Sequence, residues 1–129
     1  MTLEESIATV CSLPREFRRR DVSMVHLVAE SGYLDYRGSI SSTAIEHFLS
    51  AHPEHMEDWE LESLDSRSSD AWFFQPVSAA RDGAWRVGRG SELHTFPDHI
   101  RACSFYVCRF VEGIYRRHFD ESYSNNRNA

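Results

Sequence analysis

The fold is decided by residues 71–118, which read AWFFQPVSAARDGAWRVGRGSELHTFPDHIRACSFYVCRFVEGIYRRH. The first half of this stretch is dense in β-forming aromatics at residues 72–74, and apolar and polar side chains alternate over residues 85–87. Glycines at two positions shortly afterwards favour a hairpin. We therefore expect a small antiparallel β-meander at about residues 71–96.

The second half of the stretch has the apolar spacing of an amphipathic helix. The residues that share the apolar face are Ile100, Cys103, Val107, Phe110, Val111 and Ile114. Pro97 precedes them and is favoured in a first helical turn. The sequence therefore predicts a long C-terminal helix at about residues 97–118, packed on the sheet.

Outward from this stretch, the N-terminal half has helical periodicity throughout. The predicted helices run to about Ser12, from Pro14 or Asp21 to Ser31, from Ser42 or Thr43 to Pro53, and from Pro53 to near Asp65. Helices followed by a meander and a last helix are typical of an α+β fold. We expect one globular domain at residues 1–121 and a polar, disordered tail at residues 122–129.

The bulk composition restricts the class of protein. The chain has 129 residues and 41% hydrophobic residues, which suffices for a single core. It shows neither an apolar run of roughly 20 residues nor a secretory signal, so the expected compartment is the cytoplasm. Cys11, Cys103 and Cys108 form neither an even set nor a CxxC pair, which favours reduced, apolar cysteines over disulfides or structural zinc. We expect no cofactor.

Negative charge is concentrated in the middle of the chain. Against a single cation, Arg67, residues 51–70 carry seven carboxylates: Glu54, Glu57, Asp58, Glu60, Glu62, Asp65 and Asp70. This segment alone accounts for the formal net charge of −6. Concentrated charge steers a cationic partner, and Trp59 among these acids is the expected exposed anchor. These seven acids and Trp59 are the predicted binding surface for a protein partner with a basic surface.

Catalytic motifs are not evident. His47, His52 and His55 lie near several carboxylates and are the basis of an alternative function, a small metal-dependent hydrolase. Pro53 separates His52 from His55 and deprives them of the fixed spacing of a helical metal-binding pair. We assign no catalytic residue and no metal ligand, and the interpretation as an enzyme is the weaker of the two.

Two further stretches are candidate binding surfaces. The arginines at positions 15, 18, 19 and 20 are interpreted as a solvated helix face because acids accompany them, so we expect no nucleic-acid partner. Because no apolar run is long enough to cross a bilayer, we also expect no membrane partner. The hairpin aromatics Trp72, Phe73, Phe74 and Trp85 are expected to face the last helix as core, although alternation places Phe73 on the side of the strand opposite to Trp72 and Phe74. An exposed aromatic face would instead indicate a homo-oligomeric regulatory module.

In size, charge and layout, the chain resembles small acidic bacterial immunity proteins of the antitoxin type. The spacing from Trp59 and Asp65 through Trp72 and Trp85 to Asp98 is also similar to a pattern in uncharacterised bacterial proteins. The first resemblance implies a single cytosolic domain that neutralises a toxin by binding its cationic surface. It implies no particular site residue.

Overall fold

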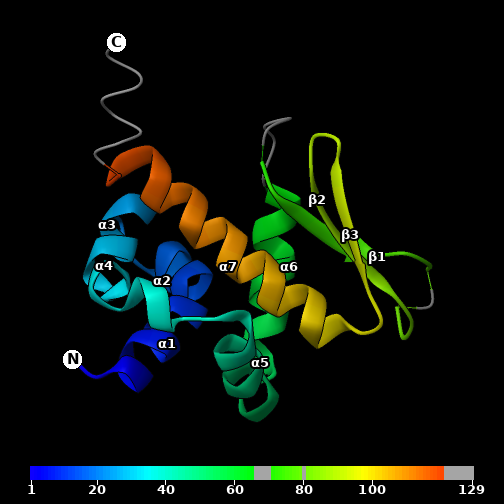
Figure 1. Cartoon of the computed structure of the whole chain (residues 1–129), viewed down its shortest axis with the longest axis horizontal. Coiled ribbons are helices and arrows are strands. Elements are labelled where there is room, and N and C mark those ends of the chain that lie inside the picture. Colours follow the sequence, from blue (N-terminus) through cyan, green and yellow to red (C-terminus); the bar gives the residue numbers. More distant parts are fainter. Residues whose placement is uncertain (66–70, 80, 121–129) are drawn as a thin grey trace.

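The long C-terminal helix, α7 (His99–His118), runs through the middle of the molecule, with the N-terminal helices on one side and the sheet on the other (Figure 1). This computed structural model describes residues 1–65, 71–79 and 81–120. Helix α7 contacts α3, α5, α6 and all three strands. The predicted α+β class is confirmed, as is the packing of a long last helix on an antiparallel sheet. The predicted tail at residues 122–129 lies outside the described residues.

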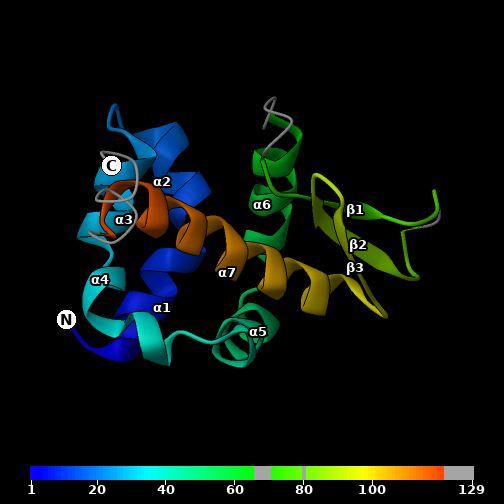
Figure 2. The same cartoon turned by 45° about the horizontal axis from the view of Figure 1, so that its top comes forward.

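The N-terminal half folds as a series of short helices, of which α1–α4 gather around the C-terminal end of α7, whereas α5 and α6 lie beside its middle (Figure 2). Their bounds are α1 (Leu3–Cys11), α2 (Leu13–Arg19), α3 (Met24–Glu30), α4 (Tyr33–Tyr36), the 3-10 turn η1 (Arg37–Ser39), α5 (Ser42–Ala51) and α6 (Glu54–Asp65). For the predicted second helix, the start at Asp21 agrees with α3, whereas a single helix from Pro14 to Ser31 is wrong because α2 and α3 are separate. Arg20 is extended and ends α2, whereas the Ser23 side chain caps α3.

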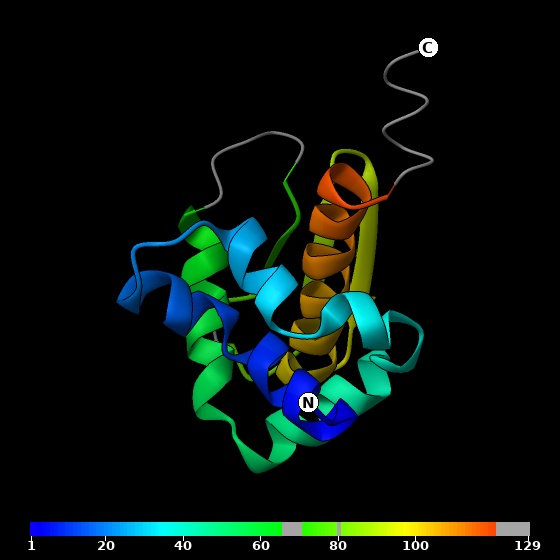
Figure 3. The ribbon, with the colours of Figure 1, turned by 90° about the vertical axis from the view of Figure 1, so that its left-hand side faces the viewer.

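The sheet is a meander in the order β1 (Phe73–Pro76), β2 (Trp85–Arg89) and β3 (Glu92–Phe96), and both pairs are antiparallel. A Cβ atom at Gly88, in the middle strand, would approach the carbonyl oxygen of Glu92 to 2.8 Å. Position 88 therefore requires glycine. Viewed from the side of the N-terminal helices, the sheet lies behind α7 (Figure 3).

The buried face of the sheet carries Phe74, Trp85 and Val87. Phe74 packs on Tyr106 of α7 with ring centroids 4.7 Å apart. Trp72, just before β1, is also buried and meets a ring of α7 edge to face. The prediction that the hairpin aromatics form core is confirmed for Trp72, Phe74 and Trp85, whereas Phe73 is only partly buried because alternation along β1 directs it to the other face of the sheet. The face on which the homo-oligomeric alternative was based is therefore covered by α7.

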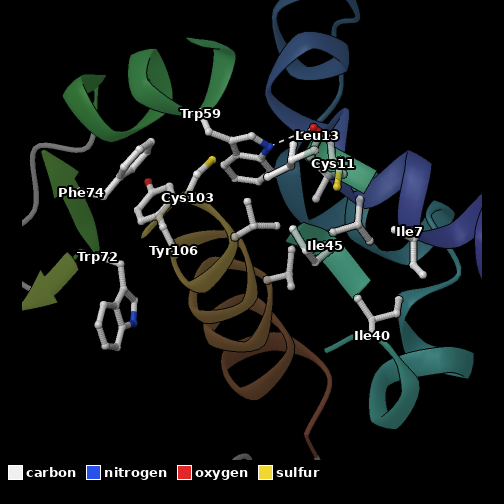
Figure 4. Close-up of a cluster of buried hydrophobic side chains, with 14 of the residues drawn as sticks. Ile7, Cys11, Leu13, Ile40, Ile45, Trp59, Trp72, Phe74, Cys103 and Tyr106 are labelled. Atoms are coloured by element: carbon white, nitrogen blue, oxygen red, sulfur yellow. Dashed lines mark hydrogen bonds between the residues drawn. The ribbon is translucent and has the colours of Figure 1, made fainter. Parts of the chain in front are cut away.

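Trp59 of α6 is at the centre of the core and is 0% exposed (Figure 4). Its indole meets Tyr106 and Phe110 of α7 edge to face, with ring centroids 5.9 and 5.3 Å away. The indole N–H donates a 2.9 Å hydrogen bond to the carbonyl oxygen of Cys11 at the end of α1. One side chain thus joins α1, α6 and α7.

A polar cluster around Glu112 fastens the turn after α3 to α7. The Glu112 carboxylate accepts hydrogen bonds from the Tyr33 hydroxyl at 2.7 Å and from Nε of Arg37 at 2.7 Å, and a second Arg37 nitrogen also donates to it. Arg116, one turn along α7, donates from 3.1 Å. Although burial opposes this effect, these donors lower the pKa of Glu112 to about 2.

Replacement of Trp59 tests its place in the core. We expect Trp59→Phe to lower the free energy of unfolding by about 1–3 kcal/mol, because it removes a buried donor and leaves space unfilled. Leu64→Ala, at a position 78% exposed on the same helix, should change it by less than about 0.5 kcal/mol. Urea unfolding followed by circular dichroism measures both, and equal small effects would contradict the burial of Trp59.

The Glu112 cluster predicts a pH-dependent contribution to stability. The pKa of this carboxyl is about 2 in the folded chain and 4.5 ordinarily, so its ionised form favours folding above about pH 4.5. We expect Glu112→Gln to be less stable than the parent chain at pH 7. The difference in the free energy of unfolding between the variant and the parent chain should become smaller as the pH falls from 4.5 toward 2. Urea unfolding at several pH values measures it, and a difference independent of pH would oppose this role.

Candidate functional site

The candidate site is built on helix α6, whose rotation is fixed by its buried side. Pro53 lies just before the helix, and Glu54 and Glu57 in its first turn favour the positive end of the helix dipole. His55, Trp59 and Ser63 follow one another at four-residue spacing and are all buried. These residues form the inner face, so the opposite face of α6 is directed outward.

Ser63 fixes the far end of the helix against the sheet. Its hydroxyl oxygen accepts a 2.9 Å hydrogen bond from the backbone N–H of Phe74 and lies 3.3 Å from the Phe74 carbonyl oxygen, to which it donates. A serine in a hydrophilic stretch is not recognisable in the sequence as a link between a helix and a strand. Together with Trp59, it leaves α6 little freedom to rotate.

The structure corrects the role assigned to Trp59. The sequence favoured an exposed anchor because acids surround this residue in the chain, but neighbours in a helix point in different directions. Trp59 lies in the core and cannot contact a partner without unfolding of the domain. The exposed apolar side chains of α6 are Leu61 and Leu64, which are 44% and 78% exposed.

Asp58 and Glu60, two of the predicted site residues, are neutralised by cations from other elements. Asp58 is buried and forms ion pairs with Arg15, at 2.9 Å, and with Arg18, both of α2. Arg81 binds Glu60. Asp58 and Glu60 therefore hold the fold together and contribute little free charge to a partner.

His99 at the start of α7 also lies against Glu60, with 2.8 Å between its Nε2 and a carboxylate oxygen. The imidazole stacks on Trp85, with centroids 3.9 Å apart. Burial lowers the pKa of His99, whereas Glu60 acts in the opposite direction. The net effect favours the neutral imidazole.

Five residues of α6 lie together on its outer face. At 3.6 residues per turn, their positions fall within roughly 100° of the helix circumference, so they form a single stripe along the helix. This α6 stripe comprises Glu54, Glu57, Leu61, Leu64 and Asp65, all of them exposed. Among the described residues, no arginine lies within 4 Å of its carboxylates, and His52 is 3.8 Å from Glu54. The structure thus brings three of the predicted acids together.

The remaining predicted acids lie at or beyond the edge of this stripe. Glu62 is only partly exposed, and burial, followed by the charge of Asp65, raises its pKa. Asp70 lies outside the described residues, as does Arg67. The sequence prediction missed the leucines because it weighed charge and aromatic content. Their signal was the helical spacing of Leu61 and Leu64 with the acids, opposite in phase to Trp59.

The histidines of the alternative function lie in different environments, although the ring centroids of His52 and His55 are 6.5 Å apart. His47 is exposed, and His52 stacks on Phe48 with centroids 4.4 Å apart. His55 is buried, and burial followed by the charge of Arg15 lowers its pKa. Within residues 1–65, 71–79 and 81–120, no three His, Cys, Asp or Glu side chains are grouped so that they could hold a metal ion.

The arginine run is occupied by ion pairs within the fold. Arg15 and Arg18 bind Asp58, whereas Arg19 and Arg20 pair with Glu16 and Glu30. Each arginine of the run therefore has a carboxylate partner.

The cysteines are free, and burial raises the pKa of Cys11 to about 12 and that of Cys108 to about 11. Burial also raises the pKa of Cys103 well above its ordinary value. All three are protonated thiols at neutral pH, which makes them poor nucleophiles.

Comparisons with family models, with curated proteins and with solved structures give no match to this chain. In the part of the chain that the structure describes, none of the helices combines the length and apolar character needed to cross a bilayer.

Two matched substitutions on α6 compare the contribution to stability of a buried acid, Asp58, with that of an exposed acid, Asp65. We expect Asp58→Asn to lower the free energy of unfolding by about 1–2 kcal/mol, because two arginines lose a charged partner. Asp65→Asn makes the same chemical change at an exposed position and should cost less than about 0.5 kcal/mol. Chemical denaturation gives both values, and equal losses would argue against a structural role peculiar to Asp58.

Proposed function

We propose that this chain is a non-enzymatic binding protein that engages a basic protein surface through the α6 stripe. Its most concrete form is a cytosolic immunity protein that neutralises a toxin. The observation that carries the proposal is the set of three carboxylates and two exposed leucines on one rigid helix face. Asp58, Trp59 and Glu60, which belonged to the predicted surface, serve the fold instead.

Charge complementarity selects a cationic partner. The margins of the stripe contain the ion pairs of Asp58 with α2 and of Glu60 with Arg81, in which opposite charges offset each other. On the exposed crest of α6, Glu54, Glu57 and Asp65 are therefore the carboxylates that have no arginine within 4 Å among the described residues. Such a focus raises the association rate with a positively charged surface and fixes its orientation.

Leu61 and Leu64 supply apolar contact area, which the carboxylates of the stripe cannot provide. Exposed carboxylates at the edge of an interface contribute mainly to the association rate, whereas desolvated apolar anchors slow dissociation. Leu61 and Leu64 are three residues apart on the helix and present adjacent side chains. A small apolar pair flanked by acids suits a partner with an apolar spot surrounded by lysine or arginine.

Charge reversal on the stripe tests the proposal. The triple variant Glu54→Lys, Glu57→Lys and Asp65→Lys is compared with a matched variant that reverses Glu4, Asp35 and Asp82, exposed acids on other elements. Each set of three charge reversals brings the formal net charge from −6 to zero, so the two variants have the same net charge. Partners captured from an extract of the source cells at low salt are purified, and their association rates are measured by biolayer interferometry.

The expected result is a fall of about tenfold or more in the association rate for the α6 variant at low salt, and a much smaller fall for the matched variant. A further variant, Leu61→Ser with Leu64→Ser, should raise the dissociation rate and leave the association rate almost unchanged. Equal association rates for the two charge variants would exclude steering by the stripe.

The immunity form of the proposal has its own measurement. If the captured partner is a toxin, adding the parent chain should inhibit it, and the α6 variant should require about tenfold more protein for the same inhibition. Inhibition that is identical for the two charge variants would assign neutralisation to another surface.

A further inference from the structure

An open cavity of about 490 Å³ lies beside α7, and its walls come from the turn after α4, the start of α5 and the middle of α7. Helix α5 packs directly on α7 (Figures 1 and 2). The volume is within the range of sites for small organic molecules, roughly 300–1,000 Å³. No residue of the α6 stripe contributes to the cavity, so binding of a ligand there is independent of the proposed function.

Glu112 is the one carboxylate in the described wall of the cavity. It already accepts hydrogen bonds from Arg37, Tyr33 and Arg116. Arg37 is further held by stacking on Tyr115, with its guanidinium carbon 4.1 Å from the ring centroid. This part of the wall is therefore rigid, and the charges of Arg37 and Glu112 offset each other within it.

Arg109 is the second cation in the wall and is held differently. Its guanidinium carbon lies over the rings of Phe105 and Trp72, 4.8 and 5.5 Å from their centroids. Among the described residues no carboxylate lies within 4 Å of it, although Glu112 is only three residues away along α7. Stacking uses the face of the guanidinium and leaves the N–H donors at its edge open.

The rest of the wall provides apolar surface. Phe105 is packed on three sides by Trp72, His94 and Phe96, with ring centroids 6.2, 4.7 and 5.1 Å away, which fixes its ring. Ile40 and Tyr33 also line the cavity. A ligand here would meet a cationic edge and an aromatic wall together.

We propose that this cavity binds a small aromatic anion. A carboxylate or phosphate head group would accept hydrogen bonds from the guanidinium edge of Arg109, whose planar fork matches both kinds of oxyanion. The ring of the ligand packs against Phe105 and Ile40. With Arg37 and Arg109 against Glu112, the lining carries an excess of positive charge, which disfavours a cationic ligand.

The test titrates the full chain with defined probes at pH 7 and fixed ionic strength, followed by amide chemical shifts in NMR. Phenyl phosphate and benzoate present the two head groups, benzyl alcohol is the neutral analogue, and inorganic phosphate lacks the ring. We expect saturable shifts around Ser42 and Phe105 with at least one aromatic anion. Benzyl alcohol and inorganic phosphate should each bind at least about tenfold more weakly.

Arg109→Gln should weaken binding of the aromatic anion about tenfold or more. Arg89→Gln is the matched control, because Arg89 also stacks on Trp72, at 5.1 Å, but does not line the cavity. It removes the same charge and should change affinity less than about twofold. Failure of both anions to saturate by about 10 mM, equal losses in the two variants, or equal affinity for the neutral alcohol would overturn the proposal.

Discussion

The burial of the Trp59 indole determines which face of helix α6 is exposed to solvent. A tryptophan side chain that contacts Tyr106 and Phe110 and donates to the Cys11 carbonyl oxygen has one position in which all three contacts exist. Rotation of α6 by one residue would break the indole hydrogen bond and bring carboxylates inward, where an unpaired charge is strongly disfavoured. The same contact that fills the core therefore decides which acids face solvent.

The charge that a partner meets differs from the charge counted along the chain. Seven acids against one cation suggests a uniformly acidic segment, yet Asp58 and Glu60 lie on the flanks of α6, where α2 and the β1–β2 connection approach. Acids on a flank are within reach of arginines from neighbouring elements, whereas the acids at the crest of the helix have no arginine within 4 Å in the part of the chain that the structure describes. Exposure on the helix, more than position in the sequence, separates structural acids from those available for binding.

Periodicity was sufficient to predict the larger elements, because the apolar face of α7, the alternation in the meander and the Pro53 start of α6 are local signals. The separation of α2 from α3 was not predicted, since residues 20–23 contain neither Pro nor Gly to mark it. Trp59 was misjudged because its neighbours in the chain are acidic, although its neighbours in space come from α1 and α7. The ion pairs of Asp58 span about 40 residues and have no local signal.

All 14 basic residues of the chain are arginines, and this affects how positive charge is held in the fold. Several arginines of the sheet and α7 side are held over aromatic rings: Arg37 on Tyr115, Arg81 on Trp85, and Arg89 and Arg109 on Trp72. A planar guanidinium can be positioned by an aromatic face, whereas a lysine ammonium would more often need a carboxylate. Among the described residues, Arg89 and Arg109 are held in this way with no carboxylate within 4 Å, which leaves the charge of Arg109 available to the cavity beside α7.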